Sequence, residues 1–492
     1  MRELLLAGTA TIGLIGAAAA QTTAVQTQPP PPIGIMGVPV APSTYLGGNN
    51  SLNSDGGPLP SSPAAPTPGT MTIHMNGRVW GYVGVQGGSG SVVAGNKLAP
   101  EQFIGYFRLY PGVDALATNG LRYGAIVEIR QNFIGQSYGL QIGNANVGST
   151  TALASNNTAG NYASSPSGDS SASTLYVRRE AVYFGSDQVG IVRLGQDDGP
   201  FSQFDNGVTT FQFGTGAWNG DGPDLIPGNA SANANFPFWS GIGAEYDPAK
   251  IAYFSPRFAG FDLGLSFAPN NGANNASPCP VAAAGCVAIA SASTTAFGGE
   301  NRPTNWYEVM GRYQGNFGGL GVYGILGYSG SGHVKAPLGP PGGAFNGSYN
   351  GFATGDAGLA MTFAGFTVGG NVLWGAFNNQ VQLKPEGAPN AVAWVGGAQY
   401  AVGPITLAAS YYNYQFQGST ATLINGKSLS QRYDDAFAAG ITYSIAPGLT
   451  GYAEYLYSQS HQGGVNLLGV GTSAEHNDVH VQSFILGTRV QW

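Results

Sequence analysis

Histidine and cysteine are the side chains that most often bind metal ions or serve in catalysis, and this sequence holds only five and two of them among 492 residues. The histidines show neither HExxH spacing nor a CxxC companion. We therefore expect polar wall or loop residues rather than metal ligands at His74, His333, His461, His476 and His480. No serine pairs with a histidine and a carboxylate by any spacing rule. The sequence predicts no catalytic residue, no metal ligand and no cofactor-binding residue.

Three local patterns resemble binding motifs but lack the context that the chemistry needs. Cys279 and Cys286 cannot close a tetrahedral metal shell without a nearby histidine. In an exported protein, their Gly/Asn/Ser/Ala-rich surroundings instead predict a disulfide that pins a loop. Residues 219–224 carry oxygen donors suited to calcium but lack the closing glutamate of a calcium loop, which favours a turn over ion binding. Residues 319–324 match a dinucleotide-binding pattern, but they lie in a predicted hairpin without a βαβ unit.

The composition indicates a chain whose surface does not face water alone. Only 9% of the residues are charged, whereas a soluble globular protein carries about a quarter. No apolar run of about 20 residues follows the N-terminus, which argues against membrane-spanning helices and leaves a barrel whose alternating strands conceal their hydrophobicity. The net charge of -7, with no cluster of lysine or arginine, argues against a nucleic-acid partner.

The first 69 residues are predicted to precede the folded domain. Residues 1–20 combine Arg2, an apolar stretch and a small-residue end at Ala20, which is typical of a secretory signal peptide. An uncleaved anchor helix is disfavoured because this segment is short and contains glycines. Residues 21–69 are rich in proline and poor in apolar side chains, so we expect a disordered periplasmic linker. A contact between this linker and peptidoglycan stays an open alternative.

From Thr70 onward the sequence alternates with period two, as in strands with one apolar and one polar face. In the first such stretch the apolar or small face holds Met71, Ile73, Met75, Gly77, Val79, Gly81, Val83 and Val85, and the polar face holds His74, Asn76, Arg78 and Gln86. Residues 121–132 repeat the pattern, with Arg122, Glu128 and Arg130 on the polar face. A one-residue slip in register would move the arginines into lipid at about 2 to 4 kcal/mol each.

Strands of a soluble β-sandwich also alternate apolar and polar side chains, so the alternation alone does not identify a membrane barrel. The order of short and long connections between strands distinguishes the two. Tight turns are predicted at residues 117–120, 186–188, 256–259 and 316–319, around 365, and at 403–404 and 446–448. Long polar loops separate them, at about residues 134–172, 198–245, 269–304, 331–354, 378–391, 417–433 and 461–477. Seven hairpins, an opening strand and a closing strand predict an all-β fold, a transmembrane antiparallel barrel of about sixteen strands over residues 70–492.

The final strand places alternate apolar side chains on one face and ends in an aromatic residue. Phe484, Leu486, Val490 and Trp492 share this face. Such an ending resembles the C-terminal signal by which the outer-membrane assembly machinery recognises barrels. A terminal tryptophan without that role is the alternative, and the alternation before it makes that alternative the weaker one.

Residues 70–492 resemble the general porin family of Gram-negative bacteria. The resemblance rests on the segments MNGR at 75–78, YFRL at 106–109 and YFSPRFAGF at 253–261. It implies a homotrimer of barrels in outer-membrane lipid, each pore narrowed by an inward-folded third loop at about residues 198–247. It also implies an acidic loop, with Asp205, Asp221 and Asp224, facing a basic wall that includes Arg78 and Arg108.

Face parity adds Arg122, Glu128, Arg130 and Arg193 to that wall. The resemblance also assigns Gln196 to the pore wall, at a position where many relatives place an arginine. Because that arginine and the acidic motif of enteric constriction loops are both absent, charge selectivity stays open. A solvated wall without any selective role is the alternative for each charged residue.

The leading functional prediction is a water-filled channel for passive diffusion of ions and small hydrophilic solutes, not an enzyme. One alternative is a substrate-preferring channel, for example for sugars, with aromatic rings along the lumen instead of at the membrane interfaces. A second is an exported adhesive or structural β-protein with long binding loops. A third is a barrel enzyme such as an outer-membrane lipase.

Overall fold

The structure is a computed structural model of the chain and describes residues 67–93, 96–97, 100–132, 176–204, 237–238, 249–270, 304–332, 334–335, 348–378, 384–418, 430–468 and 476–492. The predicted signal peptide, nearly all of the linker, Cys279, Cys286 and the three loop aspartates lie outside these residues. Within the described ranges, no helix is both long enough and apolar enough to cross a membrane.

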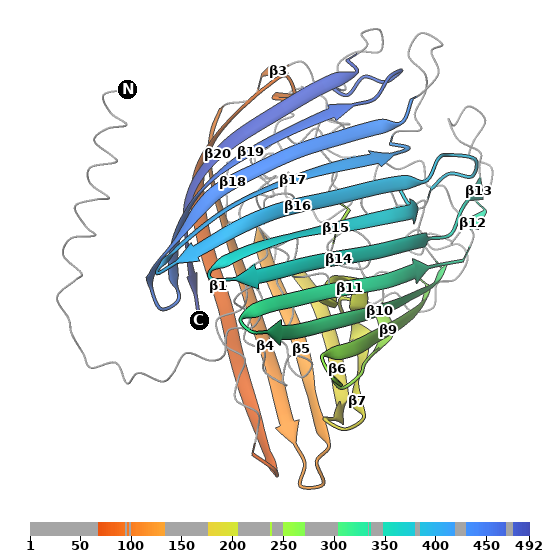
Figure 1. Cartoon of the computed structure of the whole chain (residues 1–492), viewed down its shortest axis with the longest axis vertical. Helices are drawn as coiled ribbons and strands as arrows, with labels where there is room; N and C mark the ends of the chain where they lie inside the picture. The colour runs from red at the N-terminus through yellow and green to blue at the C-terminus, as the bar shows by residue number, and fades with distance from the viewer. Residues whose placement is uncertain are drawn as a thin grey trace, which may run out of the picture.

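Sixteen antiparallel strands close into one barrel, in which each strand pairs with its neighbours along the chain and β1 pairs with β20 (Figure 1). They are β1 (Thr70–Gly87), β4 (Glu101–Leu116), β5 (Arg122–Asn132), β6 (Tyr176–Ser186), β7 (Gly190–Gln196), β8 (Ala249–Phe254), β9 (Phe261–Asn270), β10 (Thr304–Phe317), β11 (Leu320–Gly330), β14 (Ala353–Phe363), β15 (Phe366–Ala376), β16 (Ala391–Val402), β17 (Ile405–Phe416), β18 (Arg432–Ala446), β19 (Leu449–His461) and β20 (Asp478–Gln491). The predicted fold class and strand number are confirmed.

The remaining described elements lie in the connections at the end of the barrel opposite the tight turns. Two short hairpins are formed by β2 (Val92–Val93) with β3 (Asn96–Lys97) and by β12 (Val334–Lys335) with β13 (Ser348–Tyr349). A single helical turn, α4 (Pro200–Phe204), follows β7. All seven predicted tight turns join consecutive barrel strands, and the connections between those hairpins are long, so the predicted rhythm is confirmed.

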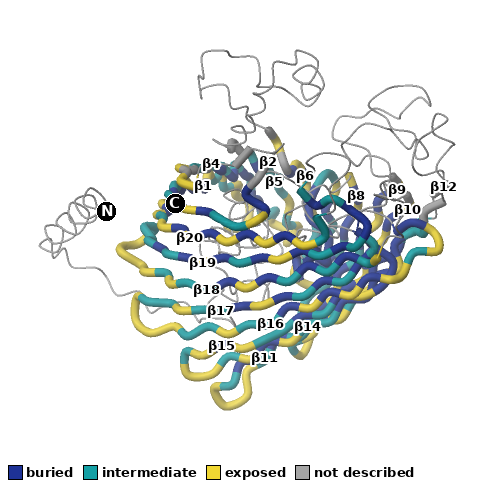
Figure 2. Tube along the Cα trace, turned by 90° about the horizontal axis from the view of Figure 1, so that it is seen from above, coloured by how far each residue is buried: buried dark blue, intermediate teal, exposed yellow. Residues whose placement is uncertain are grey.

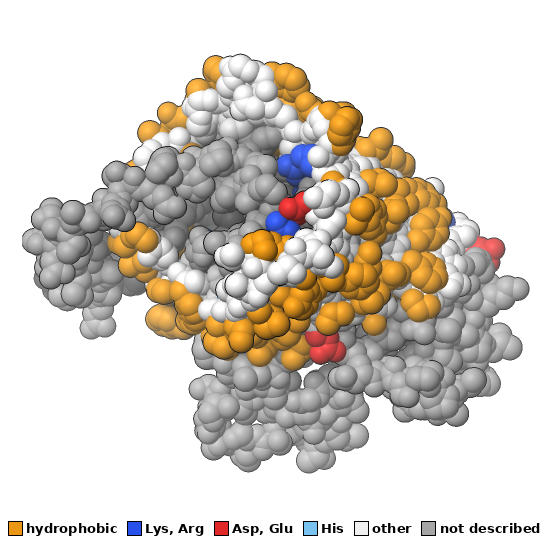
Figure 3. All heavy atoms as spheres, turned by 90° about the horizontal axis from the view of Figure 1, so that it is seen from below, with side chains coloured by type: hydrophobic (Ala, Val, Ile, Leu, Met, Phe, Trp, Pro, Cys, Tyr) orange, Lys and Arg blue, Asp and Glu red, His pale blue; other side chains and the backbone are white. Residues whose placement is uncertain are grey.

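The two faces of the strands differ in chemistry as the alternation predicts. On β1, Ile73 and Met75 are 77% and 60% exposed, whereas Arg78 and Trp80 on the other face are buried. Exposed and buried residues alternate along the strands (Figure 2). Apolar side chains cover much of the visible outer surface, and basic and acidic ones lie side by side near the centre of the view, with further acidic ones at its edges (Figure 3). Because apolar groups face outward, the barrel is built for a lipid exterior and a polar interior.

The barrel closes where the last residue meets the first strand. The backbone N–H of Trp492 donates to the carbonyl of Gly77 at 3.0 Å, and the N–H of Gly77 donates back at 3.1 Å. The Trp492 ring lies directly over Gly77, where a Cβ would be 2.9 Å from ring carbon Cε2. Phe484, Leu486 and Val490 share the exposed outer face with Trp492, as the alternation predicts. Gly77 is therefore required by the close approach of the terminal ring.

Candidate functional site: the inner wall of the barrel

A strip of arginines runs across the strands where the barrel closes. Arg78 of β1 lies directly opposite Arg108 of β4, which lies opposite Arg130 of β5. Arg489 of β20 lies one step away, opposite Trp80 of β1. Arg78, Arg108 and Arg489 are all buried on the inner face. We call these three the basic strip. The structure describes the backbone of Arg130 but not its side chain, so Arg130 extends the strip by position only.

Aromatic rings support the basic strip. The guanidinium carbons of Arg78 and Arg108 lie 4.6 and 5.2 Å from the ring centre of Trp80, and Arg78 also lies 5.8 Å from that of Tyr110. Such contacts stabilise a cation by about 0.5 to 2 kcal/mol. Like charges directly opposite one another destabilise a sheet. The strip therefore brings positive charges together at adjacent positions of neighbouring strands, with aromatic rings beside them.

A second group of charges, centred on Arg179, has a different composition. The Arg179 Nε donates to Glu128 at 2.6 Å, and its Nη1 lies 3.5 Å from Asp197 and 3.3 Å from Asp198. The Arg193 Nη1 donates to Asp197 at 2.7 Å. All five side chains are at most 3% exposed. Here each positive charge has carboxylates beside it. We call this group the Arg179 cluster.

The electrostatic environment of Asp197 follows from that packing. Burial alone would raise the pKa of Asp197, but the guanidinium groups of Arg193 and Arg179 outweigh this effect and hold the pKa below its usual value. The backbone N–H of Asp198 adds a hydrogen bond to the same carboxylate at 2.9 Å. Asp197 is therefore held as an anion at the point where β7 ends and the following loop begins.

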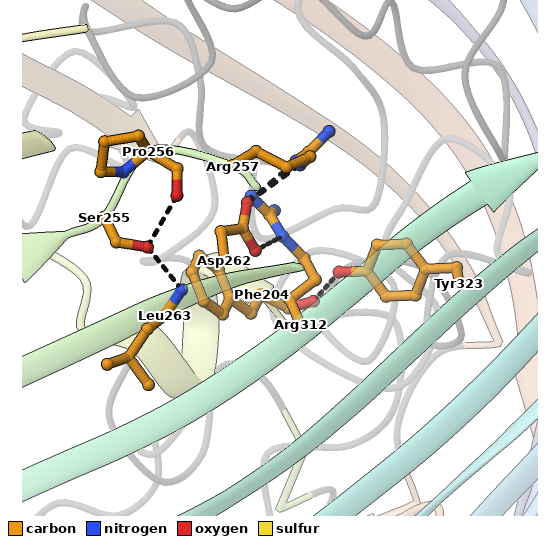
Figure 4. A network of polar contacts seen from close by, with 8 residues as sticks. All are labelled: Phe204, Ser255, Pro256, Arg257, Asp262, Leu263, Arg312 and Tyr323. Carbon is orange, nitrogen blue, oxygen red and sulfur yellow. Dashed lines mark hydrogen bonds and ion pairs between the residues drawn. The ribbon is translucent and has the colours of Figure 1, made fainter. Parts of the chain in front are cut away.

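A third group lies near the tight turn between β8 and β9 (Figure 4). The Asp262 carboxylate accepts hydrogen bonds from Arg312 at 2.7 and 2.9 Å and from Arg257 at 3.0 and 3.2 Å. The Arg312 guanidinium lies 4.1 Å from the ring centre of Phe204, and the Tyr323 hydroxyl donates to the Phe204 carbonyl. This group joins the barrel wall to the end of α4.

The start of the connection between β7 and β8 consequently lies inside the barrel. We call residues 197–204 the loop root. Its helical turn α4 contacts β9, β10 and β11, and all five of its residues are buried. This places the first seven residues of the predicted inward loop, 198–204, against the inner wall. Asp205, Asp221 and Asp224 lie outside the described residues, so their predicted positions at a constriction stay predictions.

The other predicted wall residues differ in where they lie. Glu128 and Arg193 belong to the Arg179 cluster on the inner face. Arg122 lies at the start of β5 and pairs with Asp187 of the neighbouring turn at 2.9 Å, where Asp187 is 52% exposed. Gln196 occupies an outward register position, since its cross-strand neighbours Glu180 and Ala249 are both exposed on the outer face. The expectation that Gln196 lines the pore is therefore corrected.

Several inward charged residues were not predicted. They include Asp114, Arg179, Asp197, Asp198, Lys250, Asp262, Glu308, Arg312, Asp356, Arg432, Asp434, Glu454 and Arg489. The available signal is strand parity, because each lies at an inward position of an alternating strand or, for Asp197 and Asp198, in the two residues that follow β7. Parity applied to every strand would have found most of them.

His74 is the predicted polar residue whose surroundings are most defined. Its Nε2 lies 3.0 Å from Asp114, and Asp114 also accepts a hydrogen bond from the Tyr183 hydroxyl. Among the described residues, no group of three or more His, Cys, Asp or Glu side chains is arranged to hold a metal ion. His74 thus lies on the polar face of β1, within ion-pair distance of Asp114.

Comparison with known proteins extends these observations. A family model described as "Gram-negative porin" matches residues 112–463. No curated protein matches the chain by sequence. Among solved structures, an anion-selective porin from Comamonas acidovorans is 12% identical, with 86% of this chain and 100% of that one covered and a TM-score of 0.50. The outer-membrane protein OmpT of Vibrio cholerae, folded in vitro, is 14% identical over 86% and 99%, with a TM-score of 0.48. At such identities the first likeness shows the fold alone.

Proposed function

Because this chain belongs to the Gram-negative porin family, it is an outer-membrane channel for passive diffusion of ions and small hydrophilic solutes, and we propose that its lumen favours anions. The observation that carries this proposal is the basic strip. Arg78 and Arg108 face each other across neighbouring strands, with Arg489 one step away. No chemistry on the solute is required, because selection by such a wall is steric and electrostatic.

The arrangement of the counter-charges supports an anion preference. In the Arg179 cluster and around Asp262, each described carboxylate lies within ion-pair distance of an arginine. Their fields therefore cancel in large part at short range. On β1 and β4, Arg78 and Arg108 place two positive charges at directly opposite positions. Positive charge gathered on one side of a narrow aqueous path raises the local concentration of anions and lowers that of cations.

The likeness to an anion-selective porin adds no weight to this assignment, because it extends to the fold and not to the side chains. The proposal rests on the basic strip of this chain. The acidic residues Asp205, Asp221 and Asp224 would oppose the strip if they line the same passage. The sign of the selectivity therefore tests which of the two groups dominates.

Reversal potential in a salt gradient tests the proposal. The purified protein in a planar lipid bilayer, with potassium chloride more concentrated on one side, should give a potential of the sign set by chloride permeation. A potential of the opposite sign would overturn the anion preference. Adding neutral sugars to the same bilayer distinguishes a general pore from a substrate-preferring channel. Saturable block of the ion current would support a sugar-binding site, and unchanged current would support a general pore.

We also propose that the protein is exported by residues 1–20, carries a periplasmic linker over residues 21–69, and assembles as a homotrimer. The support for export is the arrangement of Arg2, the apolar stretch and Ala20. The exposed outer row that ends in Trp492 fits recognition by the assembly machinery. Mass measurement of the mature protein in detergent tests both the cleavage and the trimer, since a monomer that retains residue 1 would contradict them.

A further inference from the structure

The loop root is held against the barrel wall by contacts at both of its ends. On one side, Asp197 and Asp198 belong to the Arg179 cluster formed with β5, β6 and β7. On the other, Phe204 lies under Arg312 of β10, packs 5.8 Å from Phe254 of β8 and accepts the Tyr323 hydroxyl of β11. Between these two ends, one buried carboxylate meets the backbone of the root.

That carboxylate belongs to Glu308 of β10, which is 1% exposed. It accepts a hydrogen bond from the backbone N–H of Phe201 in α4 and another from the Ser266 hydroxyl at 3.1 Å. The first N–H groups of a helical turn have no partner within the turn. Glu308 therefore satisfies a backbone donor of α4 from the barrel wall and fixes the direction in which the root runs.

The close approach depends on two residues without side chains. A Cβ at Gly199 would overlap the Glu308 carboxylate, and a Cβ at Gly264 of β9 would be 2.7 Å from the Pro200 ring. Real Cβ atoms do not approach other atoms so closely, so a side chain at Gly199 would displace the Glu308 carboxylate, and one at Gly264 would displace the Pro200 ring. The root and the wall are complementary in shape as well as in hydrogen bonding.

We propose that Glu308 and Gly199 are positioning residues that set where the loop root lies in the lumen, and with it the single conducting state of the pore. Glu308 holds the root through the Phe201 N–H, and Gly199 leaves room for that carboxylate. The inference concerns the position of residues 197–204 and is independent of whether the pore favours anions. The proposal on ion selectivity and the proposal on the steadiness of the conductance can therefore be refuted independently.

Gly199→Ala tests the space requirement in the full-length protein. We expect loss of the single steady conductance level, replaced by increased open-channel noise and several sub-levels, while the barrel itself stays folded. Gly311→Ala is the matched control, because Gly311 lies outward on the same strand as Glu308 and a Cβ there would be 3.7 Å from its nearest neighbour. Single-channel recording gives the levels, and the heat-dependent shift in electrophoretic mobility reports that the barrel is folded.

Glu308→Gln and Glu308→Ala separate hydrogen bonding from charge. Both remove the negative charge, but glutamine keeps an acceptor for the Phe201 N–H. Glu308→Gln should retain the steady level and Glu308→Ala should lose it. Equal noise in the two variants would overturn the positioning role, and would do so even if Gly199→Ala failed to fold.

The double variant Gly199→Ala with Glu308→Ala completes the test. If both residues act through one contact, the added Cβ has nothing left to displace, so the double variant should be no noisier than Glu308→Ala alone. Additive effects would show that the two residues act separately and would contradict the proposal. A Gly199→Ala channel with native noise would contradict it directly.

Discussion

Two groups of strands in the inner wall arrange their charged side chains differently. On β20, β1 and β4 the chain gathers arginines as neighbours, with aromatic rings beside them. On β5 to β10 it surrounds Arg179, Arg193 and Arg312 with carboxylates at ion-pair distances. The first arrangement places positive charges side by side, whereas the second pairs opposite charges and fixes a loop. The proposed selectivity and the position of the loop root therefore depend on different strands of one barrel.

Among variants that test this difference, Arg179→Gln is expected to lower the free energy of unfolding most. Removing one partner of a buried ion pair leaves uncompensated carboxylates and costs about 3 to 5 kcal/mol. Here Glu128, Asp197 and Asp198 would all lose their shared cation. Chemical unfolding of the protein in detergent should show the loss, and Arg179→Lys should recover part of it. A fully native unfolding midpoint would mean that the cluster does not stabilise the fold.

The dependence of stability on pH gives a second test of the Arg179 cluster, through the carboxylate of Asp197. Its folded-state pKa lies below the ordinary value, so its contribution to stability is fully present above the ordinary aspartate pKa of 3.8 and is lost as the pH falls below that value. Unfolding followed from pH 7 downward should therefore show a loss of stability below about pH 4. Asp197→Asn should flatten that part of the profile. If the variant lost stability below about pH 4 as the native protein does, Asp197 would not be the group responsible for that loss.

The smallest effect is expected at the edge of the same wall, where Arg122 pairs with Asp187. Asp187 is 52% exposed, and exposed ion pairs contribute about 0 to 1 kcal/mol. Arg122→Gln should leave the unfolding midpoint nearly unchanged. A loss as large as that of Arg179→Gln would show that burial does not separate the two sites.

The sequence predicts the strands and the direction in which many of their side chains face, but not which charged side chains pair with one another. Strand number, turn positions and the inward faces of Arg78 and Glu128 follow from local alternation and turn residues, which depend only on neighbours along the chain, whereas Arg108 was assigned by the family resemblance. Ion-pair partners such as Arg312 and Asp262 depend on the register between strands. The contacts of Phe204 with Tyr323 join segments that are far apart in sequence.

Gln196 illustrates the same limit at a strand end. Its neighbour Gly195 has a φ of 135°, and the position was assigned to the lumen by comparison with relatives instead of by parity. Cross-strand pairing places it opposite residues on the outer face. Residues at the last position of a strand are those for which family motifs predict the orientation least well.

The most direct test of the account compares the ion selectivity of Arg78→Gln combined with Arg108→Gln against that of Arg122→Gln. All these variants remove arginine, but only the first two positions belong to the basic strip. We expect the reversal potential of the double variant to move strongly toward cation permeation, most at low salt where screening is weak, while Arg122→Gln stays near the native value. Equal shifts per arginine removed would show that net charge alone sets the selectivity, and would contradict the central role of the basic strip.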